Sequence, residues 1–218
     1  LRSPVGQVWQ LELADKSKVW LNSGSTIRLL VADKSVGARG ADISGEAYFD
    51  IVHHDNAPFV VRLNDVEVNV LGTEFDVVNY PGVSKEVSLV KGRVQVKHKK
   101  GGVYQLKVGE KAAYDTNELE PAIMKVDLKQ VTGWKEGVFS FNEMDMTNVL
   151  TLVSRWYGVK IVYSGVKPKA QISGTIPHES SLDEILNVLQ DIGADARFEI
   201  KEDTLVVTSA TISSTRTN

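Results

Sequence analysis

The residues with the greatest capacity for metal binding or proton transfer are His53 and His54, followed directly by Asp55. Adjacent side chains in a strand point to opposite faces, so this pair cannot hold one ion from regular β geometry. The Asn-Ala-Pro that follows is a turn signal. We therefore predict that the three residues form the tip of a hairpin loop, with Pro58 opening the next strand, and that they are not a metal site.

The remaining candidates for chemistry are equally isolated. His98 lies in a basic "KHKKGG" stretch that predicts a solvated hairpin tip, and His178 follows Pro177 ahead of a helix. Glu74 and Asp76 share one strand face, a spacing typical of solvated or hydrogen-bonded carboxylates, because a glycosidase pair usually comes from different elements. The sequence contains no cysteine, no G-x-S-x-G and no helical histidine pair. We predict no catalytic residue, no cofactor and no metal, and therefore no enzyme.

Four tryptophans could form a sugar-binding platform: Trp9, Trp20, Trp134 and Trp156. Trp156 falls on an apolar helix stripe, which favours a core position. Trp9 and Trp20 could pair across a hairpin. A cell-envelope structural or carbohydrate-binding module therefore stays open as the alternative function.

The composition sets wider limits. The chain has 218 residues, 42% of them hydrophobic, with 25 basic and 28 acidic residues and a net charge of −3. This content suffices for packed cores, and the charge lacks the basic surplus of a nucleic-acid-binding domain. No apolar run reaches the roughly 18 residues of a membrane span. The chain begins "LRSPVG" without an initiator Met or signal peptide, so we expect a fragment of a longer protein.

Hydrophobic residues alternate with period two through residues 1–115, which is the pattern of half-buried strands. Turn signals such as "NYPG" and "KKGG" separate the alternating runs. We predict an all-β domain here, a sandwich or a β-solenoid-like stack. Residues 116–133 carry turn chemistry around Pro121 and predict a linker, with one short strand at Ile123–Val126.

Residues 134–208 change to helical periodicity and predict a small α+β domain of order βαβ–βαββ. In its two helices Asp145 can cap the first, which Gly158 ends, while Ser181 and Glu184 form a capping box on the second, which Gly193 ends. We expect residues 209–218, which are small and polar, to be a disordered tail. The apolar stripes comprise Met146, Val149, Leu150, Val153, Trp156 and Tyr157 in the first helix, and Leu182, Ile185, Leu186, Leu189 and Ile192 in the second.

Several motifs occur in a fixed order: "VWLNSGS", "ISGEAYFDIVHHDNAPFVV", "VNVLGTEFDV", "VSLVKGRVQV" and "LKVGEKAAY". Together they resemble the periplasmic FecR domain of transmembrane anti-sigma factors. The stretch "GWKEGVFSFNEMDMTNVLTLVSRWYGVKIVY" and the βαββ after it look like the C-terminal domain that one branch of this family adds. That domain is itself similar to the short N-terminal domain of secretins and TonB-dependent receptors. The resemblance covers Val8–Thr208.

The motif positions predict structural roles, with glycines allowing close backbone approach or a bulge, aromatics filling the core and Glu46 bonding a turn backbone. One departure from the family is Lys16, which stands where the first turn usually has glycine; we expect it to change the turn type. The motif positions are Gly45, Glu46, Phe49, Pro58, Phe59, Gly72, Thr73, Phe75, Gly92, Gly109, Trp134 and Phe141.

The resemblance implies the periplasmic sensor of an inner-membrane anti-sigma factor in a Gram-negative bacterium. Such a sensor relays the state of an outer-membrane TonB-dependent transporter, through contact with its signalling domain, to an extracytoplasmic-function sigma factor. The sigma factor would be held by a cytoplasmic segment outside this chain and released with the help of a regulatory protease. We further expect the signalling domain to add a strand to an exposed final strand, Leu205, Val206, Val207 and Thr208.

Overall fold

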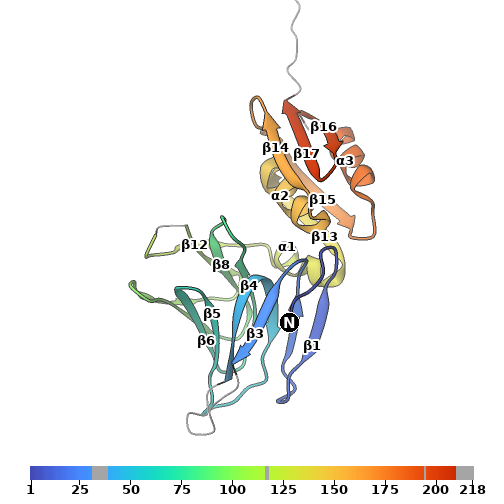
Figure 1. The fold of residues 1–218 in the computed structure, drawn as a ribbon. Coiled ribbons are helices and arrows are strands. Elements are labelled where there is room, and N and C mark those ends of the chain that lie inside the picture. Colours follow the sequence, from blue (N-terminus) through green and yellow to red (C-terminus); the bar gives the residue numbers. More distant parts are fainter. Residues whose placement is uncertain (31–38, 116–117, 194, 210–218) are drawn as a thin grey trace, which may run out of the picture. The chain divides into compact units, whose positions relative to one another are not determined.

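The computed structural model describes residues 1–30, 39–115, 118–193 and 195–209, and it divides into two units, Leu1–Glu136 and Gly137–Asn218. Figure 1 shows a first unit built almost wholly of strands and a second that combines helices with short sheets. This confirms the predicted fold class, a mainly β domain followed by a small α+β domain. The predicted tail, residues 209–218, lies outside the described residues except for its first residue.

The strands of the first unit form one twelve-stranded sheet. Its main path runs β10-β9-β6-β5-β4-β7-β8-β11-β12, while β1 pairs with β2, and both β2 and β3 pair with β4. The strands are β1 (Trp9–Glu12), β2 (Lys18–Leu21), β3 (Thr26–Leu30), β4 (Arg39–Asp50), β5 (Phe59–Leu63), β6 (Val66–Val70), β7 (Glu74–Asn79), β8 (Lys85–Lys91), β9 (Val94–His98), β10 (Val103–Leu106), β11 (Glu110–Tyr114) and β12 (Ala122–Lys125).

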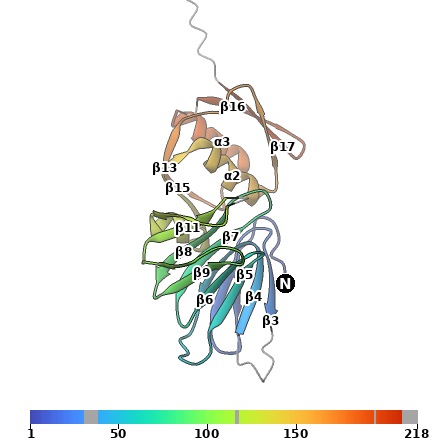
Figure 2. The same ribbon diagram turned by 90° about the vertical axis from the view of Figure 1, so that its left-hand side faces the viewer.

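The long strand β4 explains how one sheet encloses a core. Its first half pairs with β3 and β5, and its second half, from Gly45 onward, pairs with β2 and β7. The strand therefore belongs to two layers that curve around each other into a nearly closed, barrel-like sheet (Figure 2). Of the two predicted architectures the sandwich is nearer, and the stacked repeats of a solenoid are not what forms.

The enclosed core follows from the period-two pattern, because alternate side chains of each strand point inward. Phe49 on β4 stacks on Phe75 of β7, with 5.0 Å between ring centroids, and lies 5.9 Å from the ring of Phe59 on β5. These three motif aromatics are at most 2% exposed, which places them in the core as predicted. Aliphatic side chains fill the space around them, including Val19, Leu21, Ile27, Val61, Leu63, Val77, Val87 and Leu89.

The first hairpin departs from expectation at Lys16. Lys16 has a φ of 72°, so it occupies the left-handed conformation that glycine usually supplies, and the turn keeps its type. Our expectation of an altered turn is therefore wrong. The side chain reaches back to Glu12, with 2.8 Å between Nζ and Oε1.

This strained turn gives a stabilisation test. We expect Lys16→Gly to raise the midpoint of thermal unfolding by a few degrees, because glycine reaches the left-handed region without steric cost. Lys16→Ala removes the same exposed ion pair but keeps the Cβ, so it is the matched control and should give no such gain. Equal midpoints for the two variants would show that the backbone of this turn carries no strain.

Residues 118–136 differ from the predicted linker of residues 116–133. β12 pairs antiparallel with β11, and α1 (Leu128–Thr132) and the 3₁₀ helix η1 (Gly133–Glu136) follow within the first unit. The units divide after Glu136, because backbone pairing ties the preceding strand into the sheet. Residues 116 and 117 lie outside the described residues.

The second unit has the predicted order βαβ–βαββ. β13 and β15 form an antiparallel pair, and β14, β17 and β16 form a three-stranded sheet in that order. α2 packs against β13, β14 and β15, and α3 packs against β16 (Figure 1). The elements are β13 (Val138–Asp145), α2 (Met146–Tyr157), β14 (Lys160–Ser164), β15 (Gln171–Pro177), α3 (Leu182–Asp191), β16 (Ala196–Lys201) and β17 (Thr204–Ser209).

The helix ends follow the local sequence with one exception. Ser181 and Glu184 form the predicted capping box on α3, and Gly158 takes the left-handed conformation that ends α2, with a φ of 70°. Gly193, with a φ of 96°, lies just beyond α3. The side chain of Asp145 makes no capping hydrogen bond, so this part of the prediction is wrong: Asp145 belongs to β13 and pairs with β15.

Candidate functional site

The His53–Asp55 segment lies in the loop between β4 and β5. His53 Nε2 and Asp55 Oδ1 are 2.9 Å apart, and both side chains are largely exposed. The loop is a crossover and not the predicted hairpin, because β4 and β5 run parallel. Pro58 directly precedes β5, as predicted. Among the described residues no group of three His, Cys, Asp or Glu side chains could hold a metal ion.

His98 is buried, contrary to the prediction of a solvated tip. It ends β9, where the alternation that buries Val94 and Val96 also turns its imidazole inward. The ring is 5% exposed and its Nε2 lies 3.3 Å from Asp65 Oδ2. It also stacks on Tyr114, with centroids 5.9 Å apart. His98 is thus a partnered core residue.

Gly45 and Glu46 shape the bend in β4. Gly45 has a φ of 110°, and a Cβ at this position would lie 2.4–2.7 Å from atoms of Ser25, including its Cα. The backbone N–H of Glu46 donates to Ser25 Oγ at 2.9 Å, and Glu46 Oε2 accepts from Asn22 Nδ2 at 2.8 Å. Glu46 therefore binds the "NSGS" turn through a side chain, and its carbonyl oxygen also accepts from the Asn22 backbone N–H at 3.0 Å. The glycine supplies the close approach that its motif predicts.

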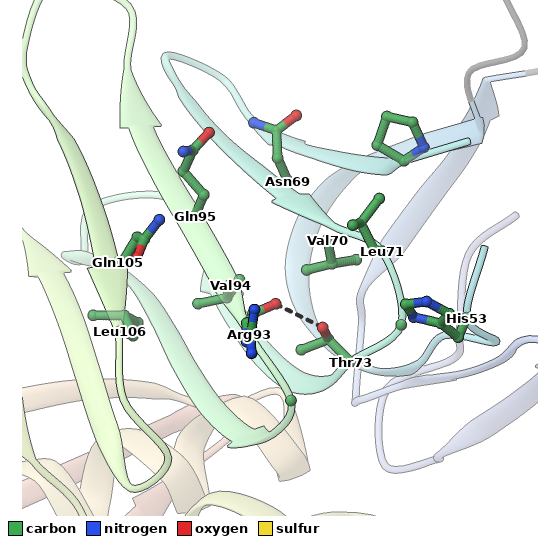
Figure 3. A pocket seen from close by; sticks show the side chains of 13 residues that line it. His53, Asn69, Val70, Leu71, Thr73, Arg93, Val94, Gln95, Gln105 and Leu106 are labelled. Carbon is green, nitrogen blue, oxygen red and sulfur yellow. Dashed lines mark hydrogen bonds between the residues drawn. The ribbon is translucent and has the colours of Figure 1, made fainter. Parts of the chain in front are cut away.

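Close contacts at Gly72, Thr73 and Gly92 hold three loops together. These are the loops between β4 and β5, between β6 and β7, and between β8 and β9. A Cβ on Gly72 would lie 2.6 Å from the Cα of His53, and a Cβ on Gly92 would lie 2.9 Å from the Gly72 carbonyl oxygen. Thr73 Oγ1 donates to the carbonyl oxygen of Arg93 at 2.7 Å, the dashed line in Figure 3. These loops form one wall of a pocket of about 750 Å³. The motif residues here build a rigid wall.

Gly109 has a simpler role. Its φ is 80°, and a Cβ would meet no atom within 4 Å. Its N–H donates to the Leu89 carbonyl oxygen, and its own carbonyl accepts from the N–H of Val126. The residue is thus needed for its backbone conformation and not for space.

Trp134 anchors the segment that ends the first unit. Trp134 is 7% exposed, and its Nε1 donates to Asp76 Oδ1 at 3.2 Å. Its neighbour Lys135 places Nζ 4.9 Å from the Trp20 ring centroid and 4.6 Å from that of Tyr48. Trp20, Tyr48 and Asp76 are successive partners across β2, β4 and β7, so they share one face of the sheet. The segment is therefore fixed on the side of the sheet away from the core.

Asp76 is the most perturbed carboxyl group on this face. Burial raises the pKa of Asp76 well above its usual value, and the charge of nearby Glu46 adds to the rise. Tyr48 Oη donates to Glu74 Oε2 at 2.8 Å, so Glu74 and Asp76 have separate partners. Both are structural carboxyl groups, as predicted, and they do not form an acid–base pair.

The tryptophans do not assemble into a platform. Trp20 lies opposite Gln10 and Tyr48 and not opposite Trp9, which is paired with Leu21. Trp134 is occupied by Asp76, and Trp156 packs at 6.0 Å from Phe139 inside the second unit. The four tryptophans therefore give no support to the carbohydrate-binding alternative.

His178 lies within an aromatic cluster of the second unit. Its ring centroid is 3.8 Å from that of Trp156 and 4.3 Å from that of Phe139, which in turn stacks on the motif residue Phe141 at 6.2 Å. His178 is 8% exposed, and neither ring nitrogen has a hydrogen-bond partner among the described residues. Burial lowers the pKa of His178 to about 4.

This burial predicts a pH dependence of stability. Below an unfolded-state pKa near 6.5 the unfolded chain binds a proton that folded His178 takes up only near pH 4. The stabilisation is therefore complete at pH 7 and is lost as the pH falls from 6.5 toward 4. We expect the free energy of unfolding of the second unit, measured in urea, to fall by on the order of 1 kcal/mol between pH 7 and pH 5. His178→Phe should remove that part of the slope, and an unchanged slope would contradict the assignment.

The predicted docking strand is placed differently from expectation. β17 is the central strand of its sheet: it pairs in parallel with β14 and antiparallel with β16. Leu205 and Val207 are at most 1% exposed. The prediction that Leu205–Thr208 form an open edge is therefore wrong, because the chain inserts its last strand between two earlier ones. β14 and β16 are the outer strands of this sheet.

Sequence reasoning also missed the polar side of the pocket in Figure 3, which includes Asn69, Arg93, Gln95 and Gln105. Period-two alternation shows that these side chains point away from the core, but only the strand register shows that three of them share a row.

Among the described residues no helix is long and apolar enough to cross a membrane.

Comparison with known proteins assigns both units. Residues 1–95 match the family described as "FecR protein", and residues 138–207 match "FecR, C-terminal". No curated protein matches the chain. Two crystal structures of a "putative anti-sigma factor" from Parabacteroides distasonis ATCC 8503 are similar along nearly the whole chain.

The two structures match this chain almost equally well. The first has a TM-score of 0.83 and 28% identity, and the match covers 95% of this chain and 97% of that one. The second has a TM-score of 0.82 and 27% identity, covering 96% and 97%. The chain belongs to the FecR family and carries a FecR domain followed by a FecR C-terminal domain.

Proposed function

We propose that this chain is the periplasmic sensor region of an inner-membrane anti-sigma factor. In this role it relays the state of an outer-membrane TonB-dependent transporter to an extracytoplasmic-function sigma factor by protein–protein contact and without catalysis. The observation that carries the proposal is the pairing of both FecR domains with a whole-chain likeness to a "putative anti-sigma factor". The sigma factor itself would be bound by a segment outside this chain.

The arrangement of the side chains supports a binding role. The motif residues bend strands, join loops or fill cores, as at Gly45, Gly72 and Phe49. The carboxyl groups with candidate chemistry have structural partners, as Asp76 has in Trp134. A relay of this kind needs two stable domains and an accessible contact surface. It needs no reactive centre.

A competition experiment in the source bacterium tests the proposal. Free sensor region, secreted to the periplasm in excess, should occupy the signalling domain of its transporter and alter induction of the genes that its sigma factor transcribes. A Gly45→Ala chain, which we expect to fold poorly, is the control and should have no effect. If the intact chain leaves the transcript levels of all genes under extracytoplasmic-function sigma factors unchanged, the contact model is wrong.

A further inference from the structure

The pocket of Figure 3 opens where β6 and β10 end and β9 begins. Its exposed apolar lining residues are Pro58 and Leu71, and Leu71 stands two positions after Asn69. Val70, Val94 and Leu106 also border the pocket but are at most 6% exposed and belong to the core. Its volume of about 750 Å³ falls in the range of small-molecule sites, which are mostly apolar with a few polar groups around them. The mouth of a barrel-like sheet is a common position for such a site.

Three neutral amide side chains form a row beside this apolar part. Asn69 on β6 is the register partner of Gln95 on β9, which is in turn the partner of Gln105 on β10. Side chains so paired lie on one face about 5 Å apart. Gln95 and Gln105 are exposed, and within the described ranges neither amide has a hydrogen-bond partner. Each offers both donors and an acceptor to a ligand.

Arg93 is the one Lys, Arg, Asp or Glu among the thirteen described residues that line the pocket. Arg93 lines it, is exposed, and has no ion-pair partner in the part of the chain that the structure describes. None of the thirteen lining residues is Asp or Glu. A guanidinium group matches the geometry of a carboxylate and can bind it through two parallel hydrogen bonds. The pocket thus suits an anionic ligand and disfavours a cation.

The wall opposite the amide row is already fixed. The close contacts of Gly72 with His53 and of Gly92 with Gly72 leave the three loops no room to shift inward. Backbone hydrogen bonds from Ile51 to Thr73 and from His54 to Leu71 tie the loops together. A site whose wall is fixed in advance loses less entropy on binding.

We propose that this pocket binds an acidic saccharide. Gln95 and Gln105 would bond hydroxyl groups, which both donate and accept, and Arg93 would pair with the sugar carboxylate. Leu71 would cover the C–H face of the ring, and Asn69, whose Nδ2 donates to Glu67 Oε1 at 3.3 Å, would offer its oxygen as an acceptor. A free phosphate uses neither the amide acceptors nor the apolar surface, so it fits less of what the pocket offers. The site lies within the FecR domain and does not depend on the proposed contact with a transporter.

Titration of the full chain by NMR tests this site directly. The probes are D-glucuronate, D-galacturonate and N-acetylneuraminate, with glucose and galactose as neutral counterparts and inorganic phosphate as a non-sugar anion. The side-chain NH₂ signals of Asn69, Gln95 and Gln105 are the readout, because they report from inside the pocket. At least one acidic sugar should shift them saturably, with a Kd on the order of 1 mM or tighter.

Two variants, one directly before β9 and one on it, separate recognition of the sugar from an effect of general charge. We expect Arg93→Gln to weaken binding of that sugar at least about tenfold. Lys97→Gln removes the same charge four residues further along the chain, on β9 and outside the pocket, and should change the affinity less than twofold. The proposal is overturned if no acidic sugar shifts the amide signals at 10 mM, a limit roughly tenfold above the expected Kd. It is equally overturned if phosphate or a neutral sugar binds as tightly, or if both variants lose affinity alike.

Discussion

Gly45→Ala should cost the FecR domain about 3 kcal/mol or more of its free energy of unfolding, and the protein should accumulate poorly. The added Cβ would lie 2.4–2.7 Å from atoms of Ser25, whose backbone N–H donates to the Asn22 carbonyl and whose hydroxyl accepts from the Glu46 N–H. The φ of 110° adds backbone strain to this overlap. Urea unfolding of the purified chain measures the loss.

Gly109→Ala is the matched control for this change. Gly109 also has a positive φ, of 80°, but a Cβ there would meet no atom within 4 Å. It should cost only about 1 kcal/mol, the conformational penalty alone. The difference between the two variants therefore measures the close approach at the bend of β4. Equal losses would contradict the role assigned to Gly45.

Trp134→Ala should have the second large effect. The substitution removes a buried indole, a change that typically costs about 3–5 kcal/mol in a core, and it leaves Asp76 buried without this hydrogen-bond donor. We expect the loss to appear first as local release of residues 128–136. Amide hydrogen exchange along this segment should therefore speed up more than exchange in β7 and β8.

Asp76→Asn is the informative companion to Trp134→Ala. An amide oxygen can still accept from Trp134 Nε1, and it avoids the cost of burying a charge. Because the pKa of Asp76 is raised, its contribution to stability falls as the pH rises from the unfolded-state value near 3.8 through the folded-state value. The Asn variant should therefore be at least as stable as the wild-type protein at pH 7 and less dependent on pH. If Trp134→Ala leaves exchange unchanged, the segment is not anchored as described.

The features that depend only on neighbouring residues in the sequence were predicted best. Period-two alternation predicts which side of each strand is buried, as at Phe49 and Phe75, and the helix stripes and the Ser181 capping box need only neighbouring residues. Sequence order alone does not show how the strands pair. The inserted position of β17 and the parallel pairing of β4 with β5 both depend on contacts between distant segments.

The same distinction separates the sites. Burial of His98 depends on β9 extending to it, and burial of His178 depends on Trp156 and Phe139 closing around it. The amide row of the pocket exists only through the register of three strands. In each case the sequence shows the residue type but does not show which residues surround it in the fold.

We propose that this chain senses an outer-membrane transporter by direct contact. The most direct measurement is retention on the immobilised chain of proteins from detergent-solubilised outer membrane of the source bacterium, identified by mass spectrometry. We predict retention of a TonB-dependent receptor that carries an N-terminal signalling domain, and its loss on Gly45→Ala chain. Absence of every such receptor from the retained fraction, with the receptors verified in the input, would contradict the account.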